Sequence, residues 1–351
     1  ISRTDSYPSV FLKAEKWHED KAGRLISGRS PRYNVEVGKY LLPIEKRVYG
    51  AIDRVFGSPT IMKGLTQEQR AVVVKNHWES FEDPVAVGQD FSKFDQHISA
   101  AALQYEHGVY LGMYQGCSTL QRLLSWQLET KCFANVQDGV VKYKVKGGRM
   151  SGDMNTAMGN CIISAALLWA YAREKGLQIR CIVDGDDSVS FMERKDLHRY
   201  RKGLEEYMKR HGFHLTVEDT VFEIHQVEFC QCKYLAAEPP TMVRNPLKAI
   251  TQDHCWVINK QLRWQEVLAA TGLGGLALYG NIPVLGAYYD MLSRAAPLSA
   301  KTRKLLDTRS GWLRDATFDG KRYEPSEETR YQMWLTWGVS PEEQRILERE
   351  F

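Results

Sequence analysis

Two adjacent carboxylates, Asp186 and Asp187, are the residues of this chain best suited to chemistry. They follow Gly185 and lie between an apolar run that ends at Val183 and an alternating run that begins at Ser188. Asp-Gly between two strand-like segments predicts a hairpin. Its tip would hold both carboxylates side by side, and a divalent cation is the commonest reason for such like charges to coexist. An ordinary Asp/Gly surface turn is the alternative.

A third acid, Asp90, ends the short apolar segment 85–90, which we predict to be a strand. If this strand and the strand before Gly185 are neighbours in one sheet, three carboxylates meet at one edge. Three acids on two strands can hold two Mg²⁺ ions about 4 Å apart, the geometry for in-line phosphoryl transfer. One ion would lower the pKa of an attacking hydroxyl, and the other would neutralise a leaving pyrophosphate. The alternative is that Asp90 caps the helix that follows.

A loop of small residues, SGDMNTAMGN at 151–160, leads into an apolar helix. It carries hydroxyl and amide groups at Ser151, Thr156 and Asn160, which suit hydrogen bonds to the sugar or base edges of a nucleotide. A simple capped entry into the helix is the alternative.

Hydrophobic periodicity and turn signals predict the elements that position these residues. Strands alternate with helices only in the middle third, which indicates an α+β layer flanked by two mainly helical lobes. The predicted helices are 39–56 (with Pro43 in an early turn), 66–80, 98–114, 160–174, 197–211 and one starting near 340. The predicted strands are 85–90, 140–145, 179–183 and 227–235, with turns at 272–275 and 280–281.

The composition is that of an ordinary globular chain of 351 residues, with 43% hydrophobic and 26% charged residues. A net charge of +4 does not by itself indicate a polyanionic partner, but basic residues cluster at 13–47 and at 142–149. Solvated surface is the alternative for both clusters. The seven Cys fit no common zinc spacing and are expected as reduced thiols. No membrane segment is evident, and the initial Ile suggests a fragment or a processed product.

Three motifs in one order resemble the palm of the RNA-dependent RNA polymerases of positive-strand RNA viruses. They are Asp-x4-Asp at 90–95, Ser-Gly-Asp-x2-Thr-x3-Asn at 151–160 and Gly-Asp-Asp at 185–187. The amino-acid sequences of these motifs are most similar to those of the tombusvirus-type branch, and the flaviviruses are more distant. Residues 24–53 resemble the basic fingers motif F and the helix behind it, 227–235 resemble motif E, and 271–284 resemble a thumb segment. The resemblance covers about residues 20–290.

This resemblance implies an α+β right-hand polymerase with an antiparallel-sheet palm flanked by helices. The expected parts are fingers at 1–83 (motif F at about 20–34), palm at 84–110, fingers at 111–149, palm at 150–236 and thumb at 237–351. It implies template-directed RNA synthesis from nucleoside triphosphates on an RNA template, with two Mg²⁺ ions for which Mn²⁺ substitutes. Other viral or host replication proteins are expected partners. The expected location is the host-cell cytoplasm, in membrane-associated replication complexes held through parts not present here.

The resemblance also implies residue roles. Asp90 and Asp186 would be the main metal ligands, with Asp187 beside them. Asp95, Ser151 and Asn160 would read the ribose 2′-hydroxyl, supported by Thr156, because a site built to hydrogen-bond a hydroxyl rejects the analogue that lacks it. The basic residues expected along the nucleotide or template channel are Lys21, Arg24, Arg29, Arg32, Lys142, Lys144 and Lys146.

The proton donor to pyrophosphate is left open by the sequence. Relatives often carry Lys where this chain has Thr216, and His211, His214 or Lys209 are candidates for the role. Two other functions stay as alternatives. A reverse transcriptase or another palm polymerase is disfavoured by Asp95, where DNA-synthesising relatives usually carry a bulky residue. A catalytically silent RNA-binding scaffold would be expected to lack a metal-site acid.

Overall fold

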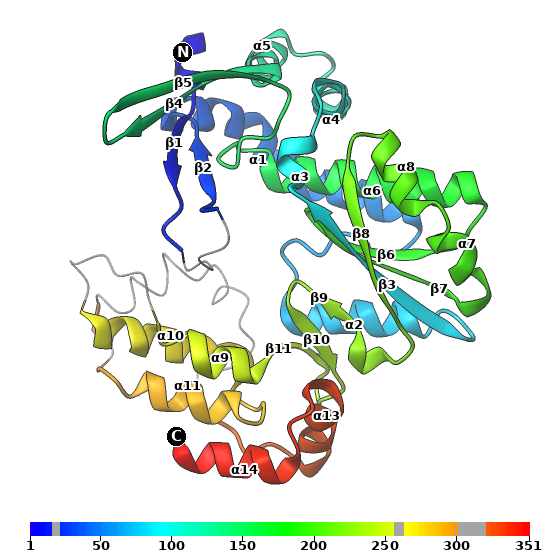
Figure 1. The fold of residues 1–351 in the computed structure, drawn as a ribbon, viewed down its shortest axis with the longest axis vertical. Helices are drawn as coiled ribbons and strands as arrows, with labels where there is room; N and C mark the ends of the chain where they lie inside the picture. Colours follow the sequence, from blue (N-terminus) through cyan, green and yellow to red (C-terminus); the bar gives the residue numbers. More distant parts are fainter. Residues whose placement is uncertain (16–21, 256–262, 298, 301–320) are drawn as a thin grey trace. The chain divides into compact units, whose positions relative to one another are not determined.

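The computed structural model describes residues 1–15, 22–255, 263–297, 299–300 and 321–351 (Figure 1). The chain forms two compact units. The first contains Ile1–Lys63 and Phe81–Thr220, and the second contains Gly64–Ser80 and Val221–Phe351. Helices and strands are mixed along the chain, as the α+β prediction requires.

A four-stranded sheet forms the centre of the first unit. Its strands are β3 (Pro84–Ser92), β6 (Arg180–Asp184), β7 (Asp187–Glu193) and β8 (His214–Val221), in the order β6-β7-β3-β8. Strand β7 pairs antiparallel with both β6 and β3. The neighbour of the Asp90 strand is therefore β7, the strand after the Gly-Asp-Asp turn, whereas β6, the strand before Gly185, lies one position further along the same sheet.

The main core of the first unit lies between this sheet and the helices α6 (Thr156–Lys175), α7 (Leu197–Arg201) and α8 (Leu204–Arg210). Side chains at alternate positions of β3 and β6 enter it, because successive residues of a strand point to opposite faces. The single helix predicted at 197–211 is interrupted at Gly203, whose φ of +89° is left-handed and ends the α7 segment. The break lets α7 and α8 follow the sheet in two directions (Figure 1).

A second core joins α6 to α1 (Pro31–Phe56), α4 (Ala100–Met113) and α5 (Ser118–Leu128). Helix α1 begins eight residues before the predicted start at 39, because Ser30 caps it and Pro31 occupies its first turn. Pro43, predicted for an early turn, lies within the helix instead. The short helix α3 (Phe94–His97) connects β3 to α4.

A second sheet of the first unit has the order β2-β1-β4-β5. It consists of β1 (Ser9–Leu12), β2 (Leu25–Gly28), β4 (Glu129–Val136) and β5 (Gly139–Lys146), and Figure 1 shows β4 and β5 as a long hairpin. Strand β5 is exposed along almost its whole length, more than the half-exposed strand expected there. Strand β2 bridges to the glycine loop through Gly28 and Gly152.

The second unit combines the helix α2 (Gln67–Trp78) with a small sheet of order β11-β10-β9. Its strands are β9 (Glu228–Phe229), β10 (Cys232–Leu235) and β11 (Thr241–Arg244). The single strand predicted at 227–235 is thus divided, because Cys230 and Gln231 both take positive φ and turn the chain back. Thr66 caps α2 with a capping box to Gln69, which confirms the predicted helix start.

The described helices of the rest of the second unit are α9 (Pro246–Gln252), α10 (Trp264–Tyr279), α11 (Leu285–Ser293), α13 (Glu327–Trp337) and α14 (Pro341–Glu350). The turn predicted at 272–275 is wrong, because these glycines lie inside α10. A side chain at Gly275 would overlap the ring of Tyr289 on α11, so the small residues permit close packing of the two helices. Ser340 caps α14, as predicted. None of the described helices has the length and apolar character needed to span a bilayer.

The aromatic cluster at the base of β8 should be essential for the first unit. Phe213 is buried and stacks on Phe94 at a ring distance of 4.9 Å, with Phe91 6.0 Å away. We expect Phe213→Ala to lower the free energy of unfolding by about 3–5 kcal/mol, because it leaves a cavity in the core. Phe222→Ala, at a side chain that is 44% exposed, should stay within about 0.5 kcal/mol. Urea denaturation measures both, and equal losses would contradict this packing account.

Candidate active site

The Gly-Asp-Asp sequence forms the predicted hairpin between β6 and β7. Asp184 pairs with Asp187, which leaves Gly185 and Asp186 as the two turn residues. Gly185 has a φ of +82°, a conformation that a residue with a side chain rarely adopts. Helix α6 holds this turn, because Ser164 Oγ donates to the Gly185 carbonyl at 2.6 Å and the Gly185 amide donates to Cys161 Sγ at 3.2 Å.

Asp90 lies at the same end of the sheet as this hairpin. The residue before it, Gln89, pairs with Ser188, so Asp90 and Asp187 come next in the register of the two neighbouring strands. Asp90, Asp186 and Asp187 are all solvent-exposed. The sheet therefore brings the three predicted acids to one edge that a substrate can reach.

The electrostatics of this edge show an excess of negative charge. Although Asp186 is exposed, partial desolvation by the surrounding protein raises its pKa, and the neighbouring carboxylates Asp90 and Asp184 raise it further. The backbone and Lys63 act in the opposite direction. Lys63 forms an ion pair with Asp184, an acid that the sequence argument had not considered.

A second polar group lies beside these acids. Asn160 Nδ2 on α6 donates to Asp95 Oδ1 on α3 at 2.8 Å. Burial raises the pKa of Asp95, while the hydrogen bond from Asn160 and the charge of Arg149 lower it and the charge of Asp186 raises it. Asp95 is thus electrostatically coupled to the Gly-Asp-Asp hairpin. The structure brings together two of the residues predicted to read ribose.

The other two predicted residues shape the glycine loop. The Ser27 amide on β2 donates to Ser151 Oγ at 2.9 Å, so Ser151 is tied to the neighbouring sheet. Thr156 begins α6, and its hydroxyl donates to the Asp153 carbonyl at 2.8 Å. Thr156 thereby stabilises the turn of the glycine loop.

Sequence reasoning missed a buried network behind Asn160. Arg149, which we had grouped with the surface lysines of 142–146, has a fully buried side chain that pairs with the fully buried Glu106 of α4. Asn155 Nδ2 also donates to Glu106, at 2.5 Å. One signal was present in the sequence: Glu106 stands between Leu103 and Tyr110 on the apolar face of a predicted helix, where a charge needs a buried partner.

Comparison with known proteins identifies the family of this chain. A family model for viral RNA dependent RNA polymerase matches residues 1–351. The chain belongs to this family.

Relatives from plant viruses support the assignment. The RNA-directed RNA polymerase of oat chlorotic stunt virus is 38% identical over 369 residues, covering 99% of this chain and 49% of the relative. Those of turnip crinkle virus and tomato bushy stunt virus are each 37% identical, covering 100% and 99% of this chain and 46% and 43% of the relatives. The tombusvirus-type resemblance is confirmed, and the chain spans about half the length of these relatives or less.

Viral RNA-dependent RNA polymerases require divalent metal ions. The exposed carboxylates at the end of β3 and β7, with the raised pKa of Asp186, fit such ions because a cation would relieve the repulsion between them. Within the described ranges, no three His, Cys, Asp or Glu side chains are grouped closely enough to form a complete ligand set.

The basic residues predicted for a viral polymerase channel lie in different environments. Arg24 and Arg32 are exposed, within 3.6 Å of Glu15 and 3.8 Å of Asp5. Lys142, Lys144 and Lys146 are exposed on β5. Lys21 lies outside the described residues.

Arg29, also predicted for the channel, lies in the interior of the first unit. Its side chain is fully buried, pairs with Asp153 of the glycine loop and donates to the Ser6 carbonyl at 2.5 Å. It therefore holds the glycine loop in this structure.

The candidate proton donors lie on α8 and β8. The His211 ring is tilted by 37° to the Tyr207 ring at a centroid distance of 4.4 Å, and its Nδ1 is 2.9 Å from the Tyr207 carbonyl. His214 is exposed at the start of β8, with its ring 4.9 Å from that of His97 on α3, the helix of Asp95. Lys209 is exposed on α8. Of the three, His214 is in contact with the element that carries Asp95.

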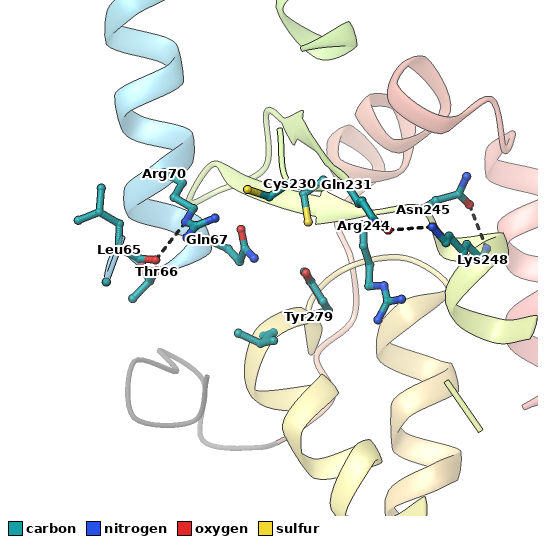
Figure 2. A pocket seen from close by; sticks show the side chains of 13 residues that line it. Leu65, Thr66, Gln67, Arg70, Cys230, Gln231, Arg244, Asn245, Lys248 and Tyr279 are labelled. Atoms are coloured by element: carbon teal, nitrogen blue, oxygen red, sulfur yellow. Dashed lines mark hydrogen bonds between the residues drawn. The ribbon is translucent and has the colours of Figure 1, made fainter. Parts of the chain in front are cut away.

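A separate basic pocket of about 450 Å³ lies within the second unit (Figure 2). Its cationic side chains come from three elements: Arg70 of α2, Arg244 of β11 and Lys248 of α9. Lys248 Nζ donates to Gln231 Oε1 at 2.8 Å, and Arg70 Nε donates to the Leu65 carbonyl at 3.3 Å. No Asp or Glu lines the pocket among the described residues.

The charge excess at Asp186 predicts how stability depends on pH and metal. A raised pKa means that ionised Asp186 is unfavourable in the folded state, so its cost is absent below the ordinary value of about 4 and complete above the raised value. We expect Asp186→Asn to raise the melting temperature of the metal-free protein at pH 7.5, with a gain that shrinks as the pH falls toward about 4.

Thermal melting with and without Mg²⁺ checks this expectation. Added Mg²⁺ should stabilise the parent more than the variant, because an ion that binds the folded state shifts the unfolding equilibrium. Asp138→Asn, at an exposed acid in the β4–β5 turn, is the control and should respond as the parent does. A variant that melts below the parent at every pH would contradict the charge argument.

Proposed function

We propose that this chain catalyses template-directed RNA synthesis from nucleoside triphosphates, with release of pyrophosphate. The observation that carries the proposal is the position of two polar groups on one helix. Helix α6 holds the Gly185 turn through Ser164 and also presents Asn160 to Asp95. Acids suited to metal-assisted phosphoryl transfer are thereby coupled to a polar pair suited to a sugar hydroxyl.

Asp90 and Asp186 would hold two Mg²⁺ ions, with Asp187 beside them and with Mn²⁺ able to substitute. The bound ions would activate the attacking 3′-hydroxyl and neutralise the leaving pyrophosphate. The protein's part is to align these carboxylates at one edge of the sheet, and Lys63 on Asp184 limits the local negative charge. The exposure of all three acids supports access by a triphosphate.

Asp95 and Asn160 would select ribose, with Ser151 beside them. Their mutual hydrogen bond fixes the amide and leaves further acceptor capacity on the Asp95 carboxylate for a 2′-hydroxyl. Deoxyribose would leave that acceptor unpaired in a partly desolvated site. This arrangement disfavours the reverse-transcriptase alternative, which needs bulk where Asp95 stands. The silent-scaffold alternative is disfavoured by the presence of every expected acid.

The right-hand architecture fits the same proposal. The sheet β6-β7-β3-β8 with α6 would be the palm, and the sheet β2-β1-β4-β5 with α1 and α5 would belong to the fingers. The helices of 237–351 would form the thumb. Among the candidate proton donors, the contact between His214 and His97 favours His214.

The pocket of Figure 2 would contact the phosphates of the nascent strand. It borders the β9–β10 turn, which lies in the segment that resembles motif E. It combines the cations Arg70 and Lys248, and Arg244 in an ion pair with Asp253, with the amide side chains of Gln231 and Asn245. Such a surface suits a polyanionic backbone and carries no base-specific pattern.

The acids give the direct test of catalysis. Asp90→Asn and Asp186→Asn should each lower nucleotide incorporation on an RNA template by at least about 10³-fold, because each removes a charge needed in the transition state. RNA binding should remain within about twofold of the parent, since neither acid attracts a polyanion. Filter binding and single-nucleotide extension measure the two properties. Retained incorporation in either variant would sink the assignment.

The basic pocket predicts a salt effect. Arg70→Gln and Lys248→Gln should each weaken RNA binding and reduce the slope of log K against log salt concentration by about one. Lys75→Gln is the matched control, because Lys75 is an exposed cation of the same helix α2 that does not line the pocket. Fluorescence anisotropy over a salt series measures the slopes. A slope that changes equally in all three variants would place the RNA elsewhere.

A further inference from the structure

We propose that the buried ion pair between Glu106 and Arg149 is a positioning device for ribose selection, acting through Asn160 on Asp95. The inference rests on the proposed function. Neither Glu106 nor Arg149 belongs to the residues that the polymerase motifs identify, and both side chains are fully buried behind them.

The contacts form one chain from α4 to the polar pair. Glu106 accepts from both terminal nitrogens of Arg149, one of them at 3.2 Å. Arg149 Nε then donates to Asn160 Oδ1 at 3.2 Å, and Asn160 Nδ2 donates to Asp95 Oδ1 at 2.8 Å. Arg149 is held by Glu106 and donates to Asn160, and Asn160 is held by Arg149 and donates to Asp95.

This series of hydrogen bonds fixes the orientation of the Asn160 amide. A guanidinium can only donate, so Arg149 requires the oxygen of Asn160 to face it. The amide nitrogen must then face Asp95. The Asp95 carboxylate can only accept, so it favours the same orientation. Without Arg149, the amide oxygen would lose its donor, and Asp95 alone would hold the amide in place. Arg149 therefore anchors the far end of the amide that donates to Asp95.

The charge of Arg149 serves the same end. Asp95 is partly desolvated and has Asp186 and Asp153 as acidic neighbours, which raise its pKa, whereas Arg149 lowers it. A protonated Asp95 is a poorer acceptor for a hydroxyl. Arg149 thus helps to keep Asp95 in the form that receives a 2′-hydroxyl.

Glu106 holds Arg149 where this action is possible. Its Oε1 also accepts from Tyr110 Oη at 2.8 Å and from Asn155 Nδ2 at 2.5 Å, so the carboxylate is fixed from several sides. The pair lies against the backbone of α6 at Gly159, where any side chain would overlap both charged groups. Gly159 precedes Asn160, so the pair is placed directly behind the residue that it orients.

Stability alone does not account for such a pair. The desolvation of two buried charges commonly offsets their attraction, and an apolar replacement is often as stable. A role in orientation gives the pair a function that an apolar core would not supply.

The test is the preference for ribonucleotide over deoxyribonucleotide, measured as the ratio of kcat/KM for GTP and dGTP on an RNA template with a templating C. We expect Glu106→Gln and Arg149→Met each to lower this ratio about tenfold, with the loss in KM for GTP and little change for dGTP. A purely structural defect reduces the fraction of active enzyme. It therefore lowers kcat/KM for GTP and for dGTP equally and leaves their ratio unchanged.

A double variant protects the test against misfolding. Glu106→Gln with Arg149→Met removes both charges, so that neither is left buried alone, and it should show the same loss of preference. The matched control is Glu348→Gln in the second unit, which breaks the pair of Glu348 with the buried Arg330. It should cost stability without changing the ratio.

The possible outcomes distinguish a failure of this inference from a failure of the proposed function. Asn160→Ala should lower the ratio as well. A lowered ratio in Asn160→Ala with a parental ratio in the Glu106 and Arg149 variants overturns the positioning role alone. A parental ratio in Asn160→Ala overturns ribose sensing and the positioning role with it. A parent that incorporates no nucleotide contradicts the proposed catalysis, and equilibrium binding of GTP and dGTP to the same variants then decides the positioning role by the same tenfold criterion.

Discussion

Repulsion among carboxylates that must remain ionised is the constraint on which this structure depends. Asp90, Asp184 and Asp186 influence one another at the end of one sheet, and partial desolvation raises the pKa of Asp186. Asp95 lies near enough to feel the same charge. Two cations offset part of this charge, Lys63 paired with Asp184 and Arg149 near Asp95. Under the proposed function, divalent ions would neutralise the exposed acids.

Helix α6 fixes the positions of the groups that surround these carboxylates. Its first turns carry Thr156 and Asn160, and the following turn carries Cys161 and Ser164, which hold the Gly185 turn. A shift of the helix would move the Gly185 turn and the Asp95–Asn160 pair together. The helix is packed on both sides, against the sheet in one core and against α1, α4 and α5 in the other. Such packing resists independent motion of the two groups.

The sequence predicted the features that depend on local chemistry. The Gly-Asp-Asp hairpin and the caps at Thr66 and Ser340 follow from turn and capping rules, and the structure has them. Long-range partners were beyond those rules. Arg29 meets Asp153 across 124 positions and Arg149 meets Glu106 across 43, so both arginines looked like surface cations. The glycines of 272–275 looked like a turn because sequence alone does not show the helix packed against them.

The most direct test of the account is nucleotide incorporation by the parent protein on a defined RNA template, with all four NTPs and all four dNTPs supplied separately in the presence of Mg²⁺. We predict incorporation of the complementary NTP, strong preference over its dNTP and no incorporation after chelation of the metal. Equal use of NTP and dNTP would contradict the role of Asp95 and Asn160. Incorporation that ignores the template base, or none at all, would contradict template-directed RNA synthesis.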